Sequence, residues 1–361
     1  MIIKDSYRCL KGCFRRVYVY LPPETTFFLV AKQAKNIAFL LISTLLGIVL
    51  MVWIYRGFNF RDLSEVFSTR HNYTWIILAL VAGIVANVLR SLRWRMLLQS
   101  ADIHIKKRRA IELVFISYLI NSVTPRLGEL TRSLLVRRGN AEVSTRAFGT
   151  VVIEKLADVV CLIVVVAAAL AFRWSDTLGL VHRFIDGIRQ AVPSYTLYIG
   201  IGLLVCIAIG LTLPRLKHIR SLLLNFWQGI TAITRLKSPK AFIGLCTGIW
   251  VCNFLQLWLI LPCYEALSNI CLIDALHIFA MASIGVLLPT PGGVGPWHFA
   301  VVKTLTNAYA APPAIAKSFA LVTHGLKTVL VMLLGVLAYV TYYWEVATGW
   351  LRQRSQQEEP Q

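Results

Sequence analysis

The hydrophobic positions of this chain form long runs, which polar and basic segments separate. A helix rises about 1.5 Å per residue and needs about 20 apolar residues to cross a bilayer. Six runs approach or exceed that length, at 37–55, 75–89, 147–172, 197–213, 241–261 and 319–343. The run at 75–89 is short, so we expect its helix to extend into its flanks. The pattern predicts an all-α polytopic integral membrane protein with about six transmembrane helices.

Two further apolar runs are too short to span a membrane. The run at 113–123 ends at Thr124-Pro125, and the run at 278–288 ends at Pro289-Thr290-Pro291. About eleven helical residues reach only ~16 Å, roughly half of a hydrocarbon core of ~30 Å. Glycine follows each run. We therefore predict two re-entrant or broken-helix hairpins, because irregular backbone at membrane depth is tolerated only inside protein or beside water.

The two halves of the chain share a spacing. Asn87 precedes Thr124 by 37 residues, and Asn253 precedes Thr290 by the same 37, which gives a common offset of 166. A long apolar run with polar residues in its first turns follows each hairpin. The expected topology gives the two units opposite orientations, so we predict an inverted repeat with a binding site at its interface.

Composition and charge favour the membrane interpretation. Hydrophobic residues make up 57% of the chain and charged residues 15%, against about 45–50% and about 25% in soluble domains. These values exclude a disordered chain, a coiled coil and a small disulfide scaffold. The net charge is +20, but the chain carries no recognisable nucleic-acid motif, so we expect no nucleic-acid partner. Anionic lipid headgroups are the expected partners of the basic residues.

The distribution of Lys and Arg predicts the topology. With the N-terminus inside, the inner segments hold 27 of the 37 basic residues and the outer segments hold 7, which agrees with the positive-inside rule. We expect a basic cytoplasmic segment at 1–35, a transmembrane domain at 36–344 and a polar cytoplasmic tail at 345–361. The predicted location is the cell (inner) membrane, with the first hairpin entering from the cytoplasm and the second from outside.

Cysteine spacing gives little indication of a bound metal. Cys9 and Cys13 have no matching His or Cys pair, so we expect neither a metal site nor a cofactor. Cys263 and Cys271 flank a short loop that the topology places outside, and a disulfide between them is left open.

The segment that follows the first short run carries candidate anion-binding residues. Pro125 ends the incoming helix, Gly128 lets the chain turn, and Glu129 is a candidate cap for the outgoing helix. Arg126 and Arg132 add guanidinium groups that match the geometry of phosphate, next to a helix start that also favours anions. The alternative is a positively charged cytoplasmic turn.

Glu154 and Asp158 lie four residues apart, on one face of a predicted span. Ionised carboxylates in a membrane cost several kcal/mol unless they are paired or hydrated. We expect Lys155, Arg126 or Arg132 to supply the cation. The pair is then an internal ion network or a proton or cation site; the alternative is a structural salt bridge at the membrane edge.

The string at 291–298, Pro-Gly-Gly-Val-Gly-Pro-Trp-His, follows the second short run. Pro291, Gly292, Gly293 and Gly295 free backbone amides at the tip of a broken helix and permit close approach of a headgroup. His298 is a candidate pH-sensitive group. The alternative is a tight external turn.

Charged and polar residues also occur at the ends or inside of two spans. Arg90, Arg93 and Trp94 close the second predicted span, where they either contact a headgroup or anchor the helix at the interface. His324 and Lys327 lie inside the last span, and we expect both to face the protein interior.

These motifs, taken in order, resemble a known family: the flippase-like transmembrane region of lysylphosphatidylglycerol synthase and a family of similar stand-alone proteins. The resemblance covers roughly residues 37–343. The motifs that carry it are Arg90-x2-Arg93-Trp94, Asn121-x3-Pro125-Arg126-x-Gly128-Glu129-x2-Arg132, Glu154-Lys155-x2-Asp158 and Pro289-x-Pro291-Gly292-Gly293-x-Gly295.

This chain departs from the family pattern at two places. Lys155 stands where the family usually has Arg, and Pro296-Trp297-His298 stands where an acidic residue is frequent. Only a short polar tail follows the last predicted span, so we expect the aminoacyl-transfer domain to be absent. The resemblance therefore implies the lipid-handling half and no synthase reaction.

Three functions follow as hypotheses. The first is a lipid translocase, and not an enzyme, that moves an anionic phospholipid or a polyprenyl-phosphate-linked lipid between leaflets. The second is a non-transporting accessory subunit of an envelope lipid or glycan enzyme. The third is a membrane-embedded lipid-phosphate transferase that uses Glu154 or Asp158 as a base. A homo-oligomer and a partner envelope enzyme are both left open.

Overall fold

The computed structural model describes residues 44–45, 47–59, 62–124, 126–137, 140–172 and 217–357, with isolated positions at 179, 182 and 186. The regular structure in these ranges is helical, and they contain no strand. The all-α prediction is confirmed. The N-terminal segment at 1–35, the predicted span at 197–213 and Pro125 lie outside the described residues.

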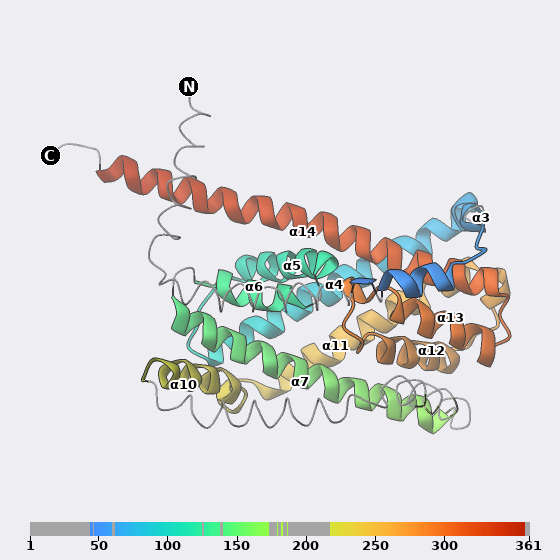
Figure 1. The fold of residues 1–361 in the computed structure, drawn as a ribbon, viewed down its shortest axis with the longest axis horizontal. Helices are drawn as coiled ribbons and strands as arrows, with labels where there is room; N and C mark the ends of the chain where they lie inside the picture. Colours follow the sequence, from blue (N-terminus) through green and yellow to red (C-terminus); the bar gives the residue numbers. More distant parts are fainter. Residues whose placement is uncertain are drawn as a thin grey trace.

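Two sets of four helices make up most of the molecule (Figure 1). Each set has a long helix, a helical hairpin of two short helices and a second long helix. The first set is α4 (Arg70–Ser100), α5 (Lys107–Val123), α6 (Leu127–Leu135) and α7 (Ala141–Phe172). The second set is α11 (Pro239–Trp258), α12 (Leu272–Gly285), α13 (Pro296–Ala308) and α14 (Pro313–Gln357).

Shorter elements precede the first set, connect the two sets or lie within the second set. They are α3 (Asp62–Ser68), α10 (Lys217–Thr231) and the 3₁₀ helices η2 (Ala232–Arg235), η3 (Leu261–Cys263), η4 (Glu265–Leu267) and η5 (Pro291–Gly293). Residues 47–54, within the first predicted span, are helical as well.

Four helical segments of the described chain are long and apolar enough to cross a membrane. They are Arg70–Ser100, Ala141–Phe172, Pro239–Cys263 and Pro313–Glu345, and they contain the runs predicted at 75–89, 147–172, 241–261 and 319–343. The helix predicted at 75–89 extends in both directions, to Arg70 and to Ser100. Arg90 and Arg93 are therefore helical residues and do not belong to a loop.

The two short runs form the helical hairpins that the sequence predicts. In the first, α5 has 17 residues and α6 has 9, and the two helices pack against each other. In the second, α12 has 14 residues and α13 has 13, and these also pack together. The chain reverses at Arg126 and at Gly292, whose φ angles are 59° and 60°. The repeat offset relates these two positions, so equivalent residues at the two tips share one left-handed backbone conformation.

The first long helices of the two sets, α4 and α11, run antiparallel through the centre of the molecule. The side chain of Asn72 donates to the carbonyl of Cys263 (3.4 Å), whereas Arg93, further along α4, donates to the sulfur of Cys246 (3.3 Å). Each set also packs its hairpin against the other set, because α5 contacts α14 and α12 contacts α7. The pattern of helix contacts is thus that of an inverted repeat.

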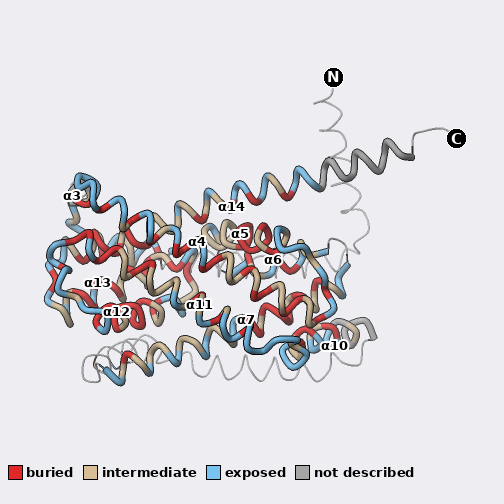
Figure 2. The backbone as a smooth tube through the Cα atoms, turned by 180° about the vertical axis from the view of Figure 1, so that it is seen from behind, coloured by how far each residue is buried: buried red, intermediate tan, exposed pale blue. Residues whose placement is uncertain are grey.

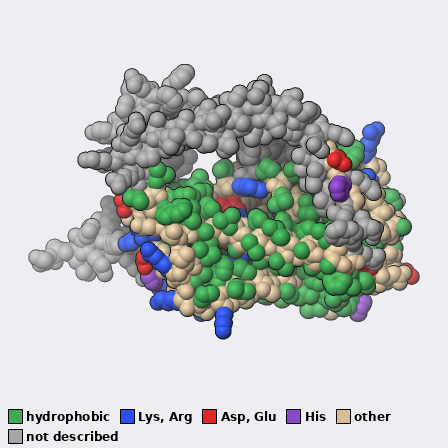
Figure 3. Space-filling model, turned by 90° about the horizontal axis from the view of Figure 1, so that it is seen from below, with side chains coloured by type: hydrophobic (Ala, Val, Ile, Leu, Met, Phe, Trp, Pro, Cys, Tyr) green, Lys and Arg blue, Asp and Glu red, His purple; other side chains and the backbone are tan. Residues whose placement is uncertain are grey.

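Buried hydrophobic residues form two main clusters (Figure 2). One joins the first half of α4 with α12, α13 and the beginning of α14, and the other joins the second half of α4 with α5 and α7. The outer faces of α7 and α14 are exposed and apolar; Val160, Ile163 and Val164 of α7 are each 60–62% exposed. Figure 3 shows a face covered mainly by hydrophobic side chains, with basic and acidic atoms in a hollow near its centre. A continuous apolar exterior of this kind suits lipid contact.

The two cysteines that flank the loop between α11 and α12 do not form a disulfide. Cys263 and Cys271 are both free thiols. The Cys263 sulfur contacts the carbonyl of Asn72 at 3.8 Å, and the Cys271 sulfur contacts a carboxylate oxygen of Asp274 at 3.1 Å. Each thiol thus has its own polar neighbour, and the disulfide is not formed.

Candidate functional site

The site is built first from the C-terminal half of α4. Arg93 and Trp94 have no exposed surface, because α4 continues past them to Ser100 and presses them against α7. In this structure neither residue has the exposed surface that a headgroup contact or an interfacial anchor needs. A buried guanidinium needs carboxylate partners, and α7 provides them.

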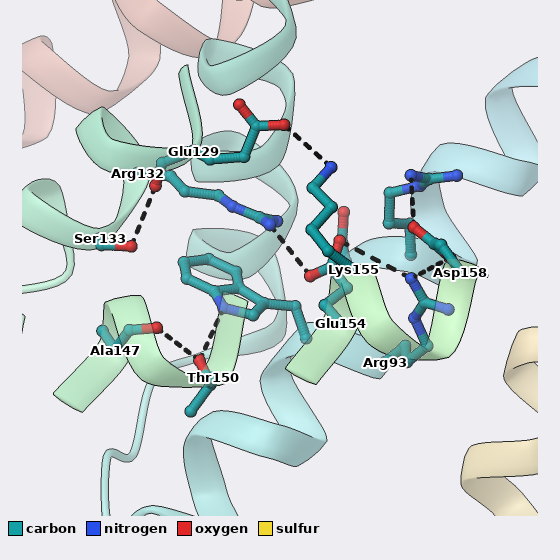
Figure 4. Close-up of polar contacts among 12 residues, drawn as sticks. Arg93, Glu129, Arg132, Ser133, Ala147, Thr150, Glu154, Lys155 and Asp158 are labelled. Carbon is teal, nitrogen blue, oxygen red and sulfur yellow. Dashed lines mark hydrogen bonds and ion pairs between the residues drawn. The ribbon is translucent and has the colours of Figure 1, made fainter. Parts of the chain in front are cut away.

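Glu154 and Asp158 of α7 form ion pairs with three arginines (Figure 4). Arg93 Nη2 lies 2.8 Å from Asp158 Oδ1 and 3.7 Å from Glu154 Oε1. Arg132 of α6 donates to Glu154 Oε2 at 3.0 Å, and Arg90 of α4 lies 3.4 Å from Asp158 Oδ2. We call these five residues the ion network. It joins α4, α6 and α7.

Lys155 has a different partner from the one expected. Its Nζ lies 2.9 Å from Glu129 Oε1, and the amide of Asn121 donates to Glu129 Oε2 at 3.0 Å. Glu129 therefore does not cap α6. Asn121 caps it instead, because its Oδ1 accepts the backbone N–H of Gly128 at 2.8 Å. That N–H is thus not free for a ligand.

Trp94 links the ion network to the body of α7. Its indole N–H donates to Thr150 Oγ1 at 3.1 Å, and the guanidinium of Arg132 lies 4.6 Å from the centre of a Trp94 ring. Thr150, which in turn donates to the carbonyl of Ala147 (2.6 Å), was missed by the sequence analysis. Its spacing of four residues from Glu154, on the same helix face, was the available signal.

Most of the charged side chains of the ion network are buried and therefore need partners of opposite charge. Glu154 and Arg93 have no exposed side-chain surface, and Arg132 has 3%. An unpaired charge in such surroundings costs several kcal/mol. The network therefore fixes α4, α6 and α7 to one another as long as all of its members keep their charges.

The tips of the two hairpins meet beside this network. Arg126 lies at the tip of the first hairpin, and its Nη2 donates to the carbonyl of Leu287, at the end of α12, at 3.0 Å. Arg126 was an expected partner of the carboxylates but contacts this carbonyl instead. At the second tip, Gly292, Gly293 and Gly295 have φ angles of 60°, 76° and 95°, a region that side chains other than glycine adopt only at a cost.

Aromatic and basic side chains surround the second tip. The rings of His298 and His324 lie 4.8 Å apart, and Trp297 lies 5.0 Å from His324. His298 is 2% exposed and His324 is 9% exposed, so both face the interior. His324 lies against the backbone of Gly292 and Gly293. Lys327, one turn further along α14, lies within electrostatic reach of Arg90.

Comparison with known protein families matches residues 39–335 to the lysylphosphatidylglycerol synthase TM region. The chain belongs to this family. A UPF0104 membrane protein from Methanocaldococcus jannaschii is 21% identical over 326 residues, which cover 85% of this chain and 95% of that protein. A UPF0104 membrane protein from Pyrococcus horikoshii is 28% identical over 113 residues, which cover 30% of this chain and 33% of that protein. No solved structure shows significant similarity to the chain.

The lysylphosphatidylglycerol synthase TM region thus contains every candidate residue of this chain, and the structure divides them into two adjoining groups. The first group, around the ion network, is Arg90, Arg93, Trp94, Asn121, Glu129, Arg132, Glu154, Lys155 and Asp158. The second group, around the hairpin tips, is Arg126, Gly128, Pro291, Gly292, Gly293, Gly295, His298, His324 and Lys327. Arg90 and Lys327 lie where the two groups adjoin.

Proposed function

We propose that this protein is a lipid translocase that moves an anionic phospholipid or a polyprenyl-phosphate-linked lipid between the leaflets of a membrane. The observation that carries the proposal is the contact between two helical hairpins of opposed orientation, where Arg126 of the first tip binds the Leu287 carbonyl of the second. This contact lies beside an ion network at membrane depth.

Opposed half-length helices support transport because they divide the barrier between the two sides of a membrane. Transporters with inverted repeats bind their substrates at the repeat interface and change access by moving one repeat against the other. Here α5 packs against α14 and α12 packs against α7, so a movement of either hairpin changes its contacts with both halves.

The charge of the site supports an anionic headgroup. Ionisable groups within a membrane usually mark a substrate or ion pathway. The exposed guanidinium of Arg126 is bound only to a backbone carbonyl, which leaves its remaining donors for a phosphate oxygen. The exposed apolar faces of α7 and α14 suit the acyl or prenyl chains.

The same proposal includes the orientation of the protein. We place it in the cell (inner) membrane with both termini in the cytoplasm, which follows from the excess of Lys and Arg in the segments assigned to the inside. The first hairpin then enters from the cytoplasm and the second from outside.

A leaflet-resolved assay in proteoliposomes tests the function. Purified protein is reconstituted with a fluorescent anionic lipid, and the fraction accessible to an external quencher is followed in time. We expect transport to exceed that of protein-free vesicles and of vesicles that hold the Arg126→Ala variant. Equal rates in all three would refute translocation and favour the accessory subunit; release of a modified lipid in the same vesicles would favour the transferase.

A further inference from the structure

Basic side chains outnumber acidic ones around the two hairpin tips. The basic residues of this region are Arg90, Arg93, Arg126, Arg132, Lys155 and Lys327, and the acidic residues are Glu129, Glu154 and Asp158. The described residues of this region thus include three more basic side chains than acidic ones. A site at membrane depth does not hold such an excess at low cost.

The ion pairs show where the excess lies. Arg90, Arg93 and Arg132 share Glu154 and Asp158, and Lys155 has Glu129. Among the described residues, the partner of Arg126 is a backbone carbonyl, that of Leu287. Lys327 has no carboxylate at ion-pair distance in the described part of the chain, and its charged neighbour is Arg90, which has the same sign. The uncompensated charge is therefore at the tips, between the two halves.

The second half of the chain does not repeat the carboxylates of the first. At the repeat offset, the positions equivalent to Glu129, Glu154 and Asp158 are occupied by Gly295, Ala320 and His324. The second half thus lacks the three carboxylates that the first half uses. Lys327 of α14 has no equivalent cation in the first half, where the corresponding position is Cys161.

Two buried hydroxyl groups beside the second tip are also unused. Thr290, which precedes Pro291, and Thr323, which precedes His324, are each 6% exposed. Neither side-chain hydroxyl has a hydrogen-bond partner among the residues that the structure describes. Phosphate oxygens accept hydrogen bonds from hydroxyl groups and from cationic side chains.

We propose that the site between the hairpin tips selects a lipid headgroup with two or more negative charges, a phosphomonoester or a diphosphate, over a phosphodiester with one. This inference rests on the proposed function and narrows its substrate class. Arg126 binds either class of headgroup, whereas Lys327 binds the second negative charge. A phosphomonoester has a second pKa of about 6 and carries close to two charges above neutral pH.

The test compares two lipids with identical acyl chains. The full chain in detergent micelles at pH 8 is titrated with dioleoyl phosphatidic acid and with dioleoyl phosphatidylglycerol, and binding is followed by intrinsic fluorescence. We expect phosphatidic acid to bind about tenfold more tightly or better, the effect of one additional charge-assisted hydrogen bond. Lys327→Gln reduces this ratio to about one and leaves phosphatidylglycerol binding within about twofold.

Two variants control for folding and for general loss of charge. Lys327→Arg keeps the charge and is expected to keep the preference. Lys317→Gln makes the same substitution on the same helix, at a residue whose ammonium group binds the backbone carbonyl of Arg56, and it should leave the ratio unchanged. A Lys327→Gln protein with an unaltered ratio would overturn the inference, as would equal binding of the two lipids by the parent protein.

The outcomes also separate this inference from the proposed function. If neither lipid binds, the translocase proposal fails for anionic phospholipids, and this inference fails with it. If both bind equally and Arg126→Ala weakens both, the function stands and only the preference for two charges is wrong. An arm with inorganic pyrophosphate identifies the source of the phosphate: displacement of phosphatidic acid at equal concentration would overturn the assignment to a lipid headgroup.

Discussion

Glu154 holds two guanidinium groups while itself having no contact with solvent. Replacing it with the neutral amide in Glu154→Gln leaves Arg93 with only Asp158 and leaves Arg132 without a carboxylate. Removal of one partner from a buried ion pair costs about 3–5 kcal/mol. We expect a clearly lower melting temperature in detergent, measured by intrinsic fluorescence, and loss of transport in the variant that still inserts.

A matched substitution on the same helix checks that the effect belongs to the network. Glu142 is exposed in the first turn of α7 and contacts the hydroxyl of Ser221 at 3.4 Å. Glu142→Gln should leave the melting temperature almost unchanged. Asp158→Asn should have an intermediate effect, since its side chain is 19% exposed. Equal melting temperatures for all three variants would show that the network does not stabilise the fold.

Arg126 gives a prediction about binding. Arg126→Ala removes the guanidinium from the tip and should weaken the binding of vesicles that contain an anionic lipid, measured by co-sedimentation at physiological salt. Arg126→Lys should restore only part of the binding, because an ammonium group lacks the planar fork that matches phosphate. Arg70→Ala, at an exposed position at the start of α4, is the control. Unchanged binding by Arg126→Ala would exclude this tip as the headgroup site.

The sequence predicted the helix face of the carboxylates better than it predicted their ion-pair partners. The i,i+4 spacing placed Glu154 and Asp158 on one face correctly, and the cost of charge in a membrane demanded cations. Arg90 and Arg93 were assigned to the end of a span, because hydropathy falls wherever charges begin. A helix continues through charged residues when tertiary partners neutralise them, and those partners lie 65 and 68 residues further along the chain.

Close contact between α5 and α6 sets the geometry of the first hairpin. A Cβ at Gly128 would overlap the backbone carbonyl of Ser117, so the two helices must separate if a side chain is added. We expect Gly128→Ala to destabilise the protein by about 1–3 kcal/mol through overpacking and to impair transport. Thermal unfolding and the proteoliposome assay measure the two effects.

Gly244 provides the comparison for this substitution. It lies within α11, and a Cβ there would meet nothing within 4 Å. Gly244→Ala should be neutral or stabilise by about 0.5–1 kcal/mol, because alanine suits a helix interior better than glycine. If both substitutions behave alike, the contact between α5 and α6 is looser than the structure indicates.

The hairpins were accessible to the sequence because hydrophobic runs and proline breaks are local signals. The first helices of the two hairpins are longer than the predicted runs, at 17 residues in α5 and 14 in α12, whereas the hairpins themselves were expected. The beginning of α5 at Lys107 was not, because its first turn is basic and contributes no apolar signal. The cap of α6 by Asn121 was missed for a different reason: Asn121 belongs to the preceding helix and reaches Gly128 only after the chain has reversed.

At the scale of the molecule, the inverted repeat predicts opposite exposure of two equivalent loops. Asp102 follows α4 and Asn269 precedes α12, and both are exposed. In a cysteine-free background, a cysteine at Asp102 should react with a membrane-impermeant maleimide only from the cytoplasmic side. A cysteine at Asn269 should react only from outside.

One outcome of the labelling experiment would contradict the predicted topology. Reaction of both cysteines from the same side would contradict the inverted topology, because α4 and α11 run antiparallel and carry these loops at their ends. The shared spacing of the two halves and the distribution of Lys and Arg supplied this topology from sequence. The exchange of hairpins between the halves had no sequence signal, since the hydrogen bond from Thr341 of α14 to Glu112 of α5 joins residues 229 positions apart.

This exchange has a consequence for biosynthesis. The ribosome makes α5 well before α14, yet α14 packs against α5 and provides Lys327 near the hairpin tips. During synthesis, the first hairpin therefore remains without its α14 contacts until α14 has been made. Its arginine and carboxylate side chains can already pair with those of α4 and α7 at that stage. A chain whose synthesis stops before α14 would retain the ion network but would leave the α14-facing surface of α5 uncovered. We expect quality-control proteases to recognise this exposed surface and degrade the incomplete chain.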